Sequence, residues 1–167
     1  MHKSRLARSL ALSITLFSAT AVAQQQFPSG SLIIPMDVDY QNAGMLRSFG
    51  LLYRLLAGGV TVNWCILPGK TLYTGATANP ASPGNSVDFT ASATDTRTNA
   101  VITNHGYRGG PFVVDAADAA TAMPIVTAWT TANPSVAVHK ATAPFTATVS
   151  RVLVNAPNIG INADGHE

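Results

Sequence analysis

The chain has 167 residues, enough for one domain with a sizeable core and too few for two. Ten basic and eight acidic residues give a net charge of +2. Lys3, Arg5 and Arg8 lie in a predicted leader, however, so the remainder carries seven basic against eight acidic residues. That balance excludes a basic surface for nucleic acid or anionic lipid. The single cysteine, Cys65, excludes an intramolecular disulfide and is expected to be a small buried hydrophobe.

Residues 1–23 have the pattern of a secretory signal peptide. A basic start precedes an apolar centre, Leu10 to Phe17, and the A-x-A cleavage signature Ala21-Val22-Ala23. The alternative, a membrane anchor, needs an apolar segment long enough for a bilayer core of roughly 30 Å, and this one is shorter. The pattern predicts cleavage after Ala23, export to the periplasm, the cell surface or the medium, and no transmembrane segment afterwards. Residues 24–30 follow as a polar lead-in for which disorder is expected.

The stretch from Ser31 to Ile66 predicts a strand, a helix and a second strand. Leu32 to Met36 is a short apolar run without alternation, typical of a strand buried on both faces, and Val60 to Ile66 is rich in β-branched residues. Asp39 or Asn42 is expected to cap the helix between them. The apolar residues of that helix recur at helical spacing: Met45, Phe49, Leu52 and Leu56. Two strands joined by a helix indicate a parallel βαβ unit.

The rest of the chain continues this alternation after a long polar insert at residues 71–98. The insert is either a surface excursion with a short strand at Val87 to Ala91 or a cover for the sheet edge. Further strands are predicted at Ala100–Thr103, Phe112–Val114, Val136–His139 and Ile159–Ile161. Helices are predicted from Ala116 to Ala122, with a break or restart at Pro124, and after Thr142, with Phe145, Val149 and Val152 as the buried stripe.

These elements predict a single α/β domain over residues 31–167. The expected architecture is flavodoxin-like, a mainly parallel sheet of about five strands with helices on both faces. No helix follows the last predicted strand, although a parallel sheet is normally covered on both faces. Two interpretations stay open: the chain is the front portion of a longer protein, or it is truncated at its C-terminus.

Candidate site residues follow from the predicted sheet, because ligands bind outside the carboxyl ends of parallel strands. The sequence places Asp37, His139 and Asp164 there as candidate catalytic residues. Asp37 and Asp39, with Asp164 and a histidine, carry donor atoms suited to a hard or borderline cation. Helix capping and turn chemistry are the commoner roles of such aspartates, and a hydrogen-bonded buried histidine is commoner than a general base. We therefore predict no metal and no cofactor.

The most suggestive short motif is Arg108-Gly109-Gly110-Pro111. Two glycines let the backbone approach a ligand or present an anion nest, and Arg108 is suited to a carboxylate or phosphate. The alternative is a tight turn before the next strand. The sequence contains none of the metalloprotease, calcium-loop, P-loop, dinucleotide-binding or nucleophile-elbow motifs. Its single glutamate, Glu167, excludes a glutamate acid–base pair within the chain.

Three blocks of sequence carry a resemblance to known proteins: Pro35–Ile66, Tyr107–Trp129 and Asn158–Gly165. Together they resemble a group of uncharacterised exported bacterial proteins in which such blocks form the front of a longer chain. Gly109-Gly110-Pro111 is also similar to a turn of the class I glutamine amidotransferase-like α/β fold, where that turn helps to form an oxyanion site. The nucleophile elbow and downstream His-Glu pair of that family have no counterpart here. The resemblance implies a scaffold and no activity.

The leading functional prediction is an exported non-catalytic module, binding or structural, that forms the front part of a larger secreted or surface protein. Its partners would then include further domains of the same chain. The alternative is a hydrolase or amidotransferase-like enzyme with its site at the carboxyl ends of the strands, so the sequence leaves enzymatic activity open. Convergence of Asp37, His139 and Asp164 in one pocket would favour the enzyme, and separate capping roles would count against it.

Overall fold

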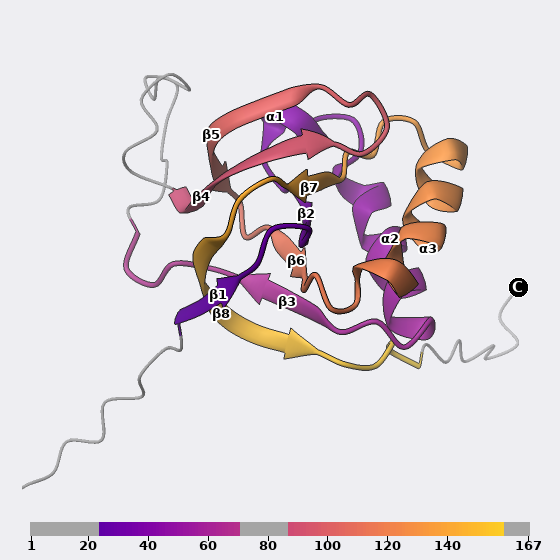
Figure 1. Ribbon diagram of the computed structural model, residues 1–167. Coiled ribbons are helices and arrows are strands. Elements are labelled where there is room, and N and C mark those ends of the chain that lie inside the picture. The colour runs from indigo at the N-terminus through magenta and orange to yellow at the C-terminus, as the bar shows by residue number, and fades with distance from the viewer. Residues whose placement is uncertain (1–23, 71–86, 159–167) are drawn as a thin grey trace, which may run out of the picture.

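The computed structural model describes residues 24–70 and 87–158, which form one curled antiparallel sheet with helices packed against it (Figure 1). The sheet has eight strands in the order β1-β8-β3-β6-β2-β7-β4-β5, and every pairing is antiparallel. The strands are β1 (Gln24–Phe27), β2 (Leu32–Ile34), β3 (Val62–Cys65), β4 (Val87–Asp95), β5 (Val101–Arg108), β6 (Phe112–Val114), β7 (His139–Ala141) and β8 (Phe145–Leu153). The helices are α1 (Val38–Gln41), α2 (Met45–Ala57) and α3 (Ala119–Ala132).

The sheet curls into a half-barrel, so that β4 approaches β8 across the curl. The long β4–β5 hairpin lies at one end of the sheet, and β1 lies at the other beside β8. Helices α2 and α3 lie side by side and pack against one face (Figure 1). The single-turn helix α1 connects β2 to α2.

The prediction of a parallel, flavodoxin-like α/β sheet is therefore wrong. β2 and β3 do run in the same direction, but they do not pair, because β6 lies between them and is antiparallel to both. The short apolar strands β2 and β6 are buried on both faces, as expected. The predicted reason, helices on both faces of a parallel sheet, does not apply. The helices cover one face of the central strands, and the curl of the sheet encloses the other.

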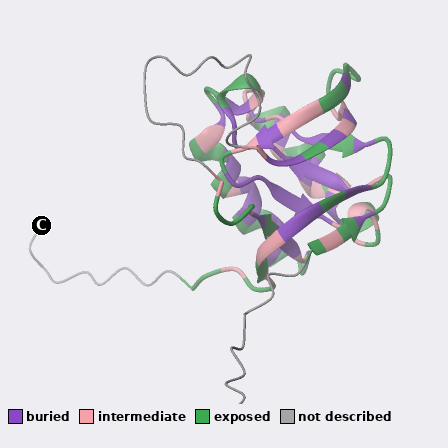
Figure 2. Ribbon diagram, turned by 90° about the vertical axis from the view of Figure 1, so that its left-hand side faces the viewer, coloured by how far each residue is buried: buried purple, intermediate pink, exposed green. Residues whose placement is uncertain are grey.

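Two hydrophobic clusters show this arrangement directly. Leu32 and Ile34 of β2 point into the cluster beneath α2 and α3, whereas Ile33 between them points into the cluster inside the curl. Figure 2 shows the central strands as the most continuously buried part of the chain. Cys65 lies in the inner cluster and is fully buried, which confirms its structural role. Burial, together with the nearby Asp88 carboxylate, raises the pKa of its thiol to about 12.

Strand β8 replaces the helix predicted after Thr142, and that prediction is wrong. Phe145 and Ala147 are buried and Val149 packs against the same inner cluster, which is the period-two pattern of a strand. Residues 24–30, for which disorder was expected, include β1 instead. Phe27 of β1 is fully buried, and its ring stacks on Phe145 at 5.3 Å. This buried aromatic pair ties the start of the described chain to β8.

The other elements agree with the sequence in part. Helix α2 forms as predicted, and Gly59, with φ +76°, follows its end, but Phe49 of the predicted buried stripe is 51% exposed. Helix α3 runs through Pro124 without the predicted break. The predicted strand at Val87–Ala91 is confirmed as the first part of β4. Residues 1–23, 71–86 and 159–167 lie outside the described chain, and with them lie the predicted signal peptide, the last predicted strand and Asp164. Within the described residues, no helix has the length and apolar character needed to cross a bilayer.

Candidate functional site

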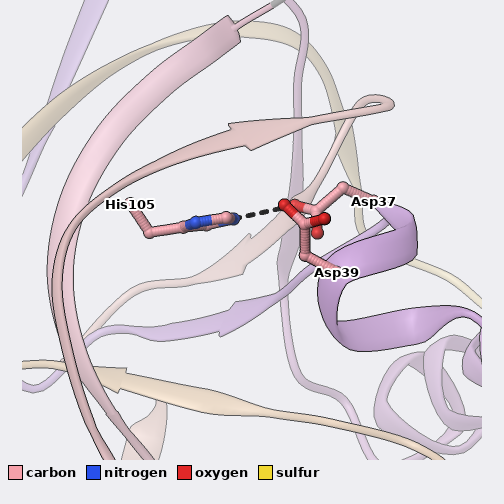
Figure 3. A group of neighbouring side chains, drawn as sticks. All are labelled: Asp37, Asp39 and His105. Carbon is pink, nitrogen blue, oxygen red and sulfur yellow. Dashed lines mark hydrogen bonds and ion pairs between the residues drawn. The ribbon is translucent and has the colours of Figure 1, made fainter. Parts of the chain in front are cut away.

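A cluster of ionisable side chains lies where the chain after β2 passes the middle of β5. Asp37 precedes α1, Asp39 belongs to α1, and His105 lies on β5. One ligand atom from each of these three residues lies within 4.8 Å of the other two. Figure 3 shows the His105 ring pointing edge-on toward the two carboxylates. We call Asp37, Asp39 and His105 the Asp–Asp–His cluster.

The two aspartates do not cap helices through their side chains. Asp37 occupies the N-cap position of α1, and its backbone carbonyl accepts the Gln41 N–H at 2.9 Å, yet its carboxylate makes no capping bond. The N-cap of α2 is Gly44, so the predicted capping by Asp39 or Asn42 is wrong. Because neither carboxylate is used at a helix terminus, both are free to face β5.

Asp37 is the buried member of the cluster. His105 Nε2 lies 3.1 Å from Asp37 Oδ2, and the Asp37 side chain is only 4% exposed. Its other oxygen, Oδ1, is buried and has no hydrogen-bond partner among the described residues. A buried carboxylate oxygen is costly to desolvate and normally has a donor or a metal ion beside it. The orphan oxygen therefore makes this cluster the candidate ligand-binding position among the described residues.

Arg108, from the end of β5, holds the second carboxylate. Its Nη2 donates to Asp39 Oδ2 at 2.8 Å, which leaves the other Asp39 oxygen for a different partner. The Arg108 Nε is buried and has no acceptor among the described residues. The guanidinium thus lies against the cluster with only part of its donor capacity used.

A β-bulge in the β4–β5 hairpin orients His105. Ala91 pairs with His105 and Ala93 with Ile102, so the single residue Ser92 faces two residues of β5. One of those two, Asn104, has φ +47°, and its backbone N–H donates to Ser92 Oγ at 3.0 Å. Bulges change the direction in which neighbouring side chains point. This one breaks the alternation of β5 immediately before His105.

His139, a predicted catalytic candidate, lies beside the cluster rather than in it. It is fully buried, and the Tyr107 hydroxyl forms a 2.9 Å hydrogen bond with its Nδ1. The Tyr40 ring lies edge-on to both His105 and His139, at 4.8 and 4.5 Å between centroids. Burial lowers the pKa of His139 to about 4; the nearby His105 also lowers it, while Asp95 and Asp37 act in the opposite direction. His139 is therefore a neutral buried side chain at pH 7.

The phenols around His139 also stay protonated at neutral pH. Burial raises the pKa of Tyr107, and Tyr40 and Asp37 raise it further. Burial likewise raises the pKa of Tyr40, with contributions from Asp37, Asp39 and Asp95. Tyr40, Tyr107 and His139 therefore contribute no charge beside the cluster at neutral pH.

The Arg-Gly-Gly motif forms a tight turn packed into the molecule. Gly109 and Gly110 have φ +76° and +73°, and a Cβ on Gly109 would lie 2.5 Å from the Met36 carbonyl oxygen. The Gly110 N–H donates to Asp88 Oδ2 at 2.9 Å, and the Gly110 carbonyl accepts from Trp64 Nε1 at 2.9 Å. Because the Gly110 N–H is bonded within the chain, the two glycines shape the turn that presents Arg108, and anion binding by them stays a prediction.

An apolar concave surface lies beside α2, away from the Asp–Asp–His cluster. It is an apolar groove of about 630 Å³ lined by aromatic and aliphatic side chains, among them Phe49, Tyr53, Trp64, Phe112 and Leu153. The groove explains why Phe49 is exposed although it lies next to the buried stripe of α2. No carboxylate or imidazole is among its described lining residues, so the ionisable chemistry lies at the Asp–Asp–His cluster.

Of the predicted site residues, the structure brings Asp37, Asp39 and Arg108 together and places His139 next to them, behind Tyr40. Asp164 lies outside the described residues. The sequence predicts that a loop from His105 to Gly110 reaches the same rim, but does not name His105 as a candidate, because Asn104 to Pro111 has the composition of a loop. The signal that could have found it is the polar pair Asn104-His105 between the strand-forming residues Val101, Ile102 and Tyr107, a pattern that suits a bulged strand.

The fold and the cluster define a small antiparallel half-barrel with two helices on one face and a carboxylate–imidazole site on its hairpin side. Comparison of the chain with protein-family models, with curated proteins and with solved structures finds no match. The functional argument therefore depends on the geometry of the site.

Proposed function

We propose that this chain is an exported, non-catalytic binding module whose Asp–Asp–His cluster takes a divalent metal ion. The observation that carries the proposal is the convergence of three ligand atoms within 4.8 Å, one of them from a buried carboxylate that has an unpartnered oxygen. The half-barrel and the bulged hairpin supply a rigid frame for this set.

The donor atoms favour a transition metal of the zinc or manganese type. Two carboxylate oxygens and one imidazole nitrogen at about 2.1 Å from a tetrahedral ion are roughly 3.4 Å apart. His105 Nε2 and Asp37 Oδ2 are already 3.1 Å apart, so an ion needs little rearrangement of this pair. Calcium prefers six to eight oxygen ligands, and an imidazole in the set disfavours it.

The surroundings of the cluster suit this role. Metal-binding carboxylates are usually held by a second hydrogen bond, and Arg108 supplies one to Asp39. The Tyr40 ring packs against His105 and restricts its rotation. An ion pair between Asp37 and His105 with no metal is the competing interpretation, and a titration separates the two.

The non-catalytic part of the proposal is supported by His139. It is the second histidine near the cluster, and burial keeps it neutral and out of reach of a substrate. A metal-dependent hydrolase is the second candidate, because three protein ligands leave a coordination position open for water. Hydrolysis of an ester or phosphoester by the metal-loaded chain, absent in D37N, would favour that candidate.

Isothermal titration of the purified chain with Zn²⁺, Mn²⁺ and Ca²⁺ tests the proposal. We expect one ion per chain, with Zn²⁺ or Mn²⁺ bound more tightly than Ca²⁺. D37N and H105Q should each weaken binding at least tenfold, by about 1.4 kcal/mol or more. D118N is the matched control, since Asp118 lies before α3 and its side chain makes no capping bond. Absence of binding, or equal binding by D37N and the unaltered chain, would overturn the proposal.

Export is supported by the charge and cleavage pattern of residues 1–23. N-terminal sequencing of the chain recovered outside the cytoplasm tests it. The expected first residue is Gln24, and a chain that keeps Met1 would contradict export by this route.

A further inference from the structure

We infer that the cation-loaded cluster binds a small oxyanion, a carboxylate or phosphate group, held jointly by the metal ion and the Arg108 guanidinium. The inference rests on the proposed function, because it requires the cation. It goes beyond cation binding by naming the ligand that the module takes and the residue that selects it.

Arg108 is positioned for such a ligand. Its side chain is only 16% exposed, so packing holds the guanidinium in place. The group has five N–H donors in a fork that matches the two oxygens of a carboxylate or phosphate. Among the described residues its hydrogen-bond acceptor is one oxygen of Asp39. Donors therefore remain for a ligand that arrives at the cluster.

The charge of the cluster makes oxyanion binding conditional on the cation. With a neutral His105, two carboxylates outweigh one guanidinium, so the metal-free cluster carries one net negative charge and repels an anion; an ion pair of Asp37 with a charged His105 leaves no net charge to attract one. A divalent ion bound with a neutral His105 changes that net charge to one positive. The Asp95 carboxylate, which acts on neighbouring Tyr40, accepts the Arg97 and Thr98 N–H groups of its own turn. An anion is thus attracted only after the metal ion has bound.

Asp39 connects the two halves of the proposed site. One of its oxygens accepts from Arg108, so an ion bound through the other oxygen would place the ion and the guanidinium on two sides of one carboxylate. Three protein ligands leave a coordination position for an outside oxygen. One oxyanion can then place one oxygen on the ion and another on Arg108, as in metal–arginine clamps on phosphoryl groups.

The backbone near Arg108 limits how the anion is held. Gly109 packs against the Met36 carbonyl, and the Gly110 N–H is bonded to Asp88. The anion is consequently held by the ion and a side chain, rather than by the glycine nest that the sequence suggested. Substitution of Arg108 should then remove anion binding, and because Arg108 also donates to Asp39, the loss is measured on chain saturated with the cation.

Spectroscopic titration of the Co²⁺-loaded chain tests the inference, because the visible absorption of Co²⁺ changes when an outside ligand enters its coordination sphere. Acetate and methylphosphonate are the carboxylate and phosphate-type probes. We expect at least one of them to bind the loaded chain ten times more tightly than the metal-free chain. By reciprocity, that probe must raise the affinity for Co²⁺ by the same factor.

Three variants complete the experiment. R108Q, titrated with the probe after saturation with Co²⁺, should lose at least tenfold in anion affinity; R108K, which keeps the charge without the fork, should lie between. R151Q, on exposed Arg151 of β8, should behave like the unaltered chain. If Co²⁺ does not bind, the proposed function fails and this inference fails with it. If Co²⁺ binds but neither probe does, or R108Q binds the probe unchanged, only this inference is overturned.

Discussion

Acidification should destabilise the fold through His139. Its imidazole is fully buried, and that burial lowers its pKa to about 4 from an ordinary 6.5. In the unfolded chain the same group protonates near pH 6.5. Between pH 6.5 and 4 the unfolded state therefore binds more protons than the folded state, and the free energy of unfolding falls as the pH falls.

The size of this effect follows from the two pKa values. Their difference, at 1.36 kcal/mol per pH unit, corresponds to about 3 kcal/mol of stability, present in full above pH 6.5 and lost by about pH 4. A domain of this size is commonly stable by about 5–15 kcal/mol, so the loss is a substantial part of the total.

Urea unfolding at half-unit steps from pH 7.5 to pH 4, followed by circular dichroism, measures the effect. H139Q provides the comparison, because glutamine does not titrate. We expect H139Q to be less stable than the unaltered chain at pH 7, since it loses a buried hydrogen bond to Tyr107. It should also lack most of the pH dependence. Parallel curves for the two proteins between pH 6.5 and 4 would refute this reasoning.

Two further predictions concern the turn that presents Arg108. D88N should cost about 3 kcal/mol in urea unfolding, because the buried Asp88 carboxylate accepts from Lys70 and from the Leu67 and Gly110 N–H groups; a loss below about 0.5 kcal/mol would contradict it. G109A should cost roughly 2 kcal/mol, since it adds a clash with the Met36 carbonyl to the strain of a positive φ. The control G59A has the same φ and open space around it, so its cost should be smaller, and equal costs would exclude the clash.

The sequence was sufficient to predict a helix or strand where the spacing of its apolar residues matches the face that the structure buries. Helix α2 has a continuous apolar stripe and a glycine stop, and the runs at β2 and β6 have too few residues for anything but strands. These short runs do not encode whether the strands pair in parallel or antiparallel. Leu32–Ile34 pairs with Phe112–Val114 in antiparallel register, and nothing in three consecutive apolar residues distinguishes that pairing from a parallel one.

The wrong prediction of a helix after Thr142, where the structure has β8, has a different physical cause. Phe145, Val149 and Val152 match helical spacing, but Phe145, Ala147 and Val149 match strand spacing equally well, and small or β-branched residues separate them. Val152 decides between the two: it is 54% exposed and belongs to neither hydrophobic cluster, so the predicted helical stripe is not buried as a unit. Pairing with β1 and β3 outweighs a weak local preference, as tertiary context commonly does.

The sequence identified the two aspartates of the cluster but not His105, because the position of His105 depends on irregular backbone. Asp37 and Asp39 were identified because they follow a buried strand, a rule that holds for strands of either direction. The expected common edge did not form, because β6 is antiparallel to β2, so the carboxyl end of β6, followed by Asp115, lies at the opposite end of β2 from Asp37. His105 reaches the aspartates through the bulge at Asn104, and a bulge depends on how two strands align. Both irregular features, the single-turn α1 and the bulge, meet at the same cluster. A regular strand alternation through β5 would change the face on which His105 lies, and with it the metal ligand that the proposed function requires.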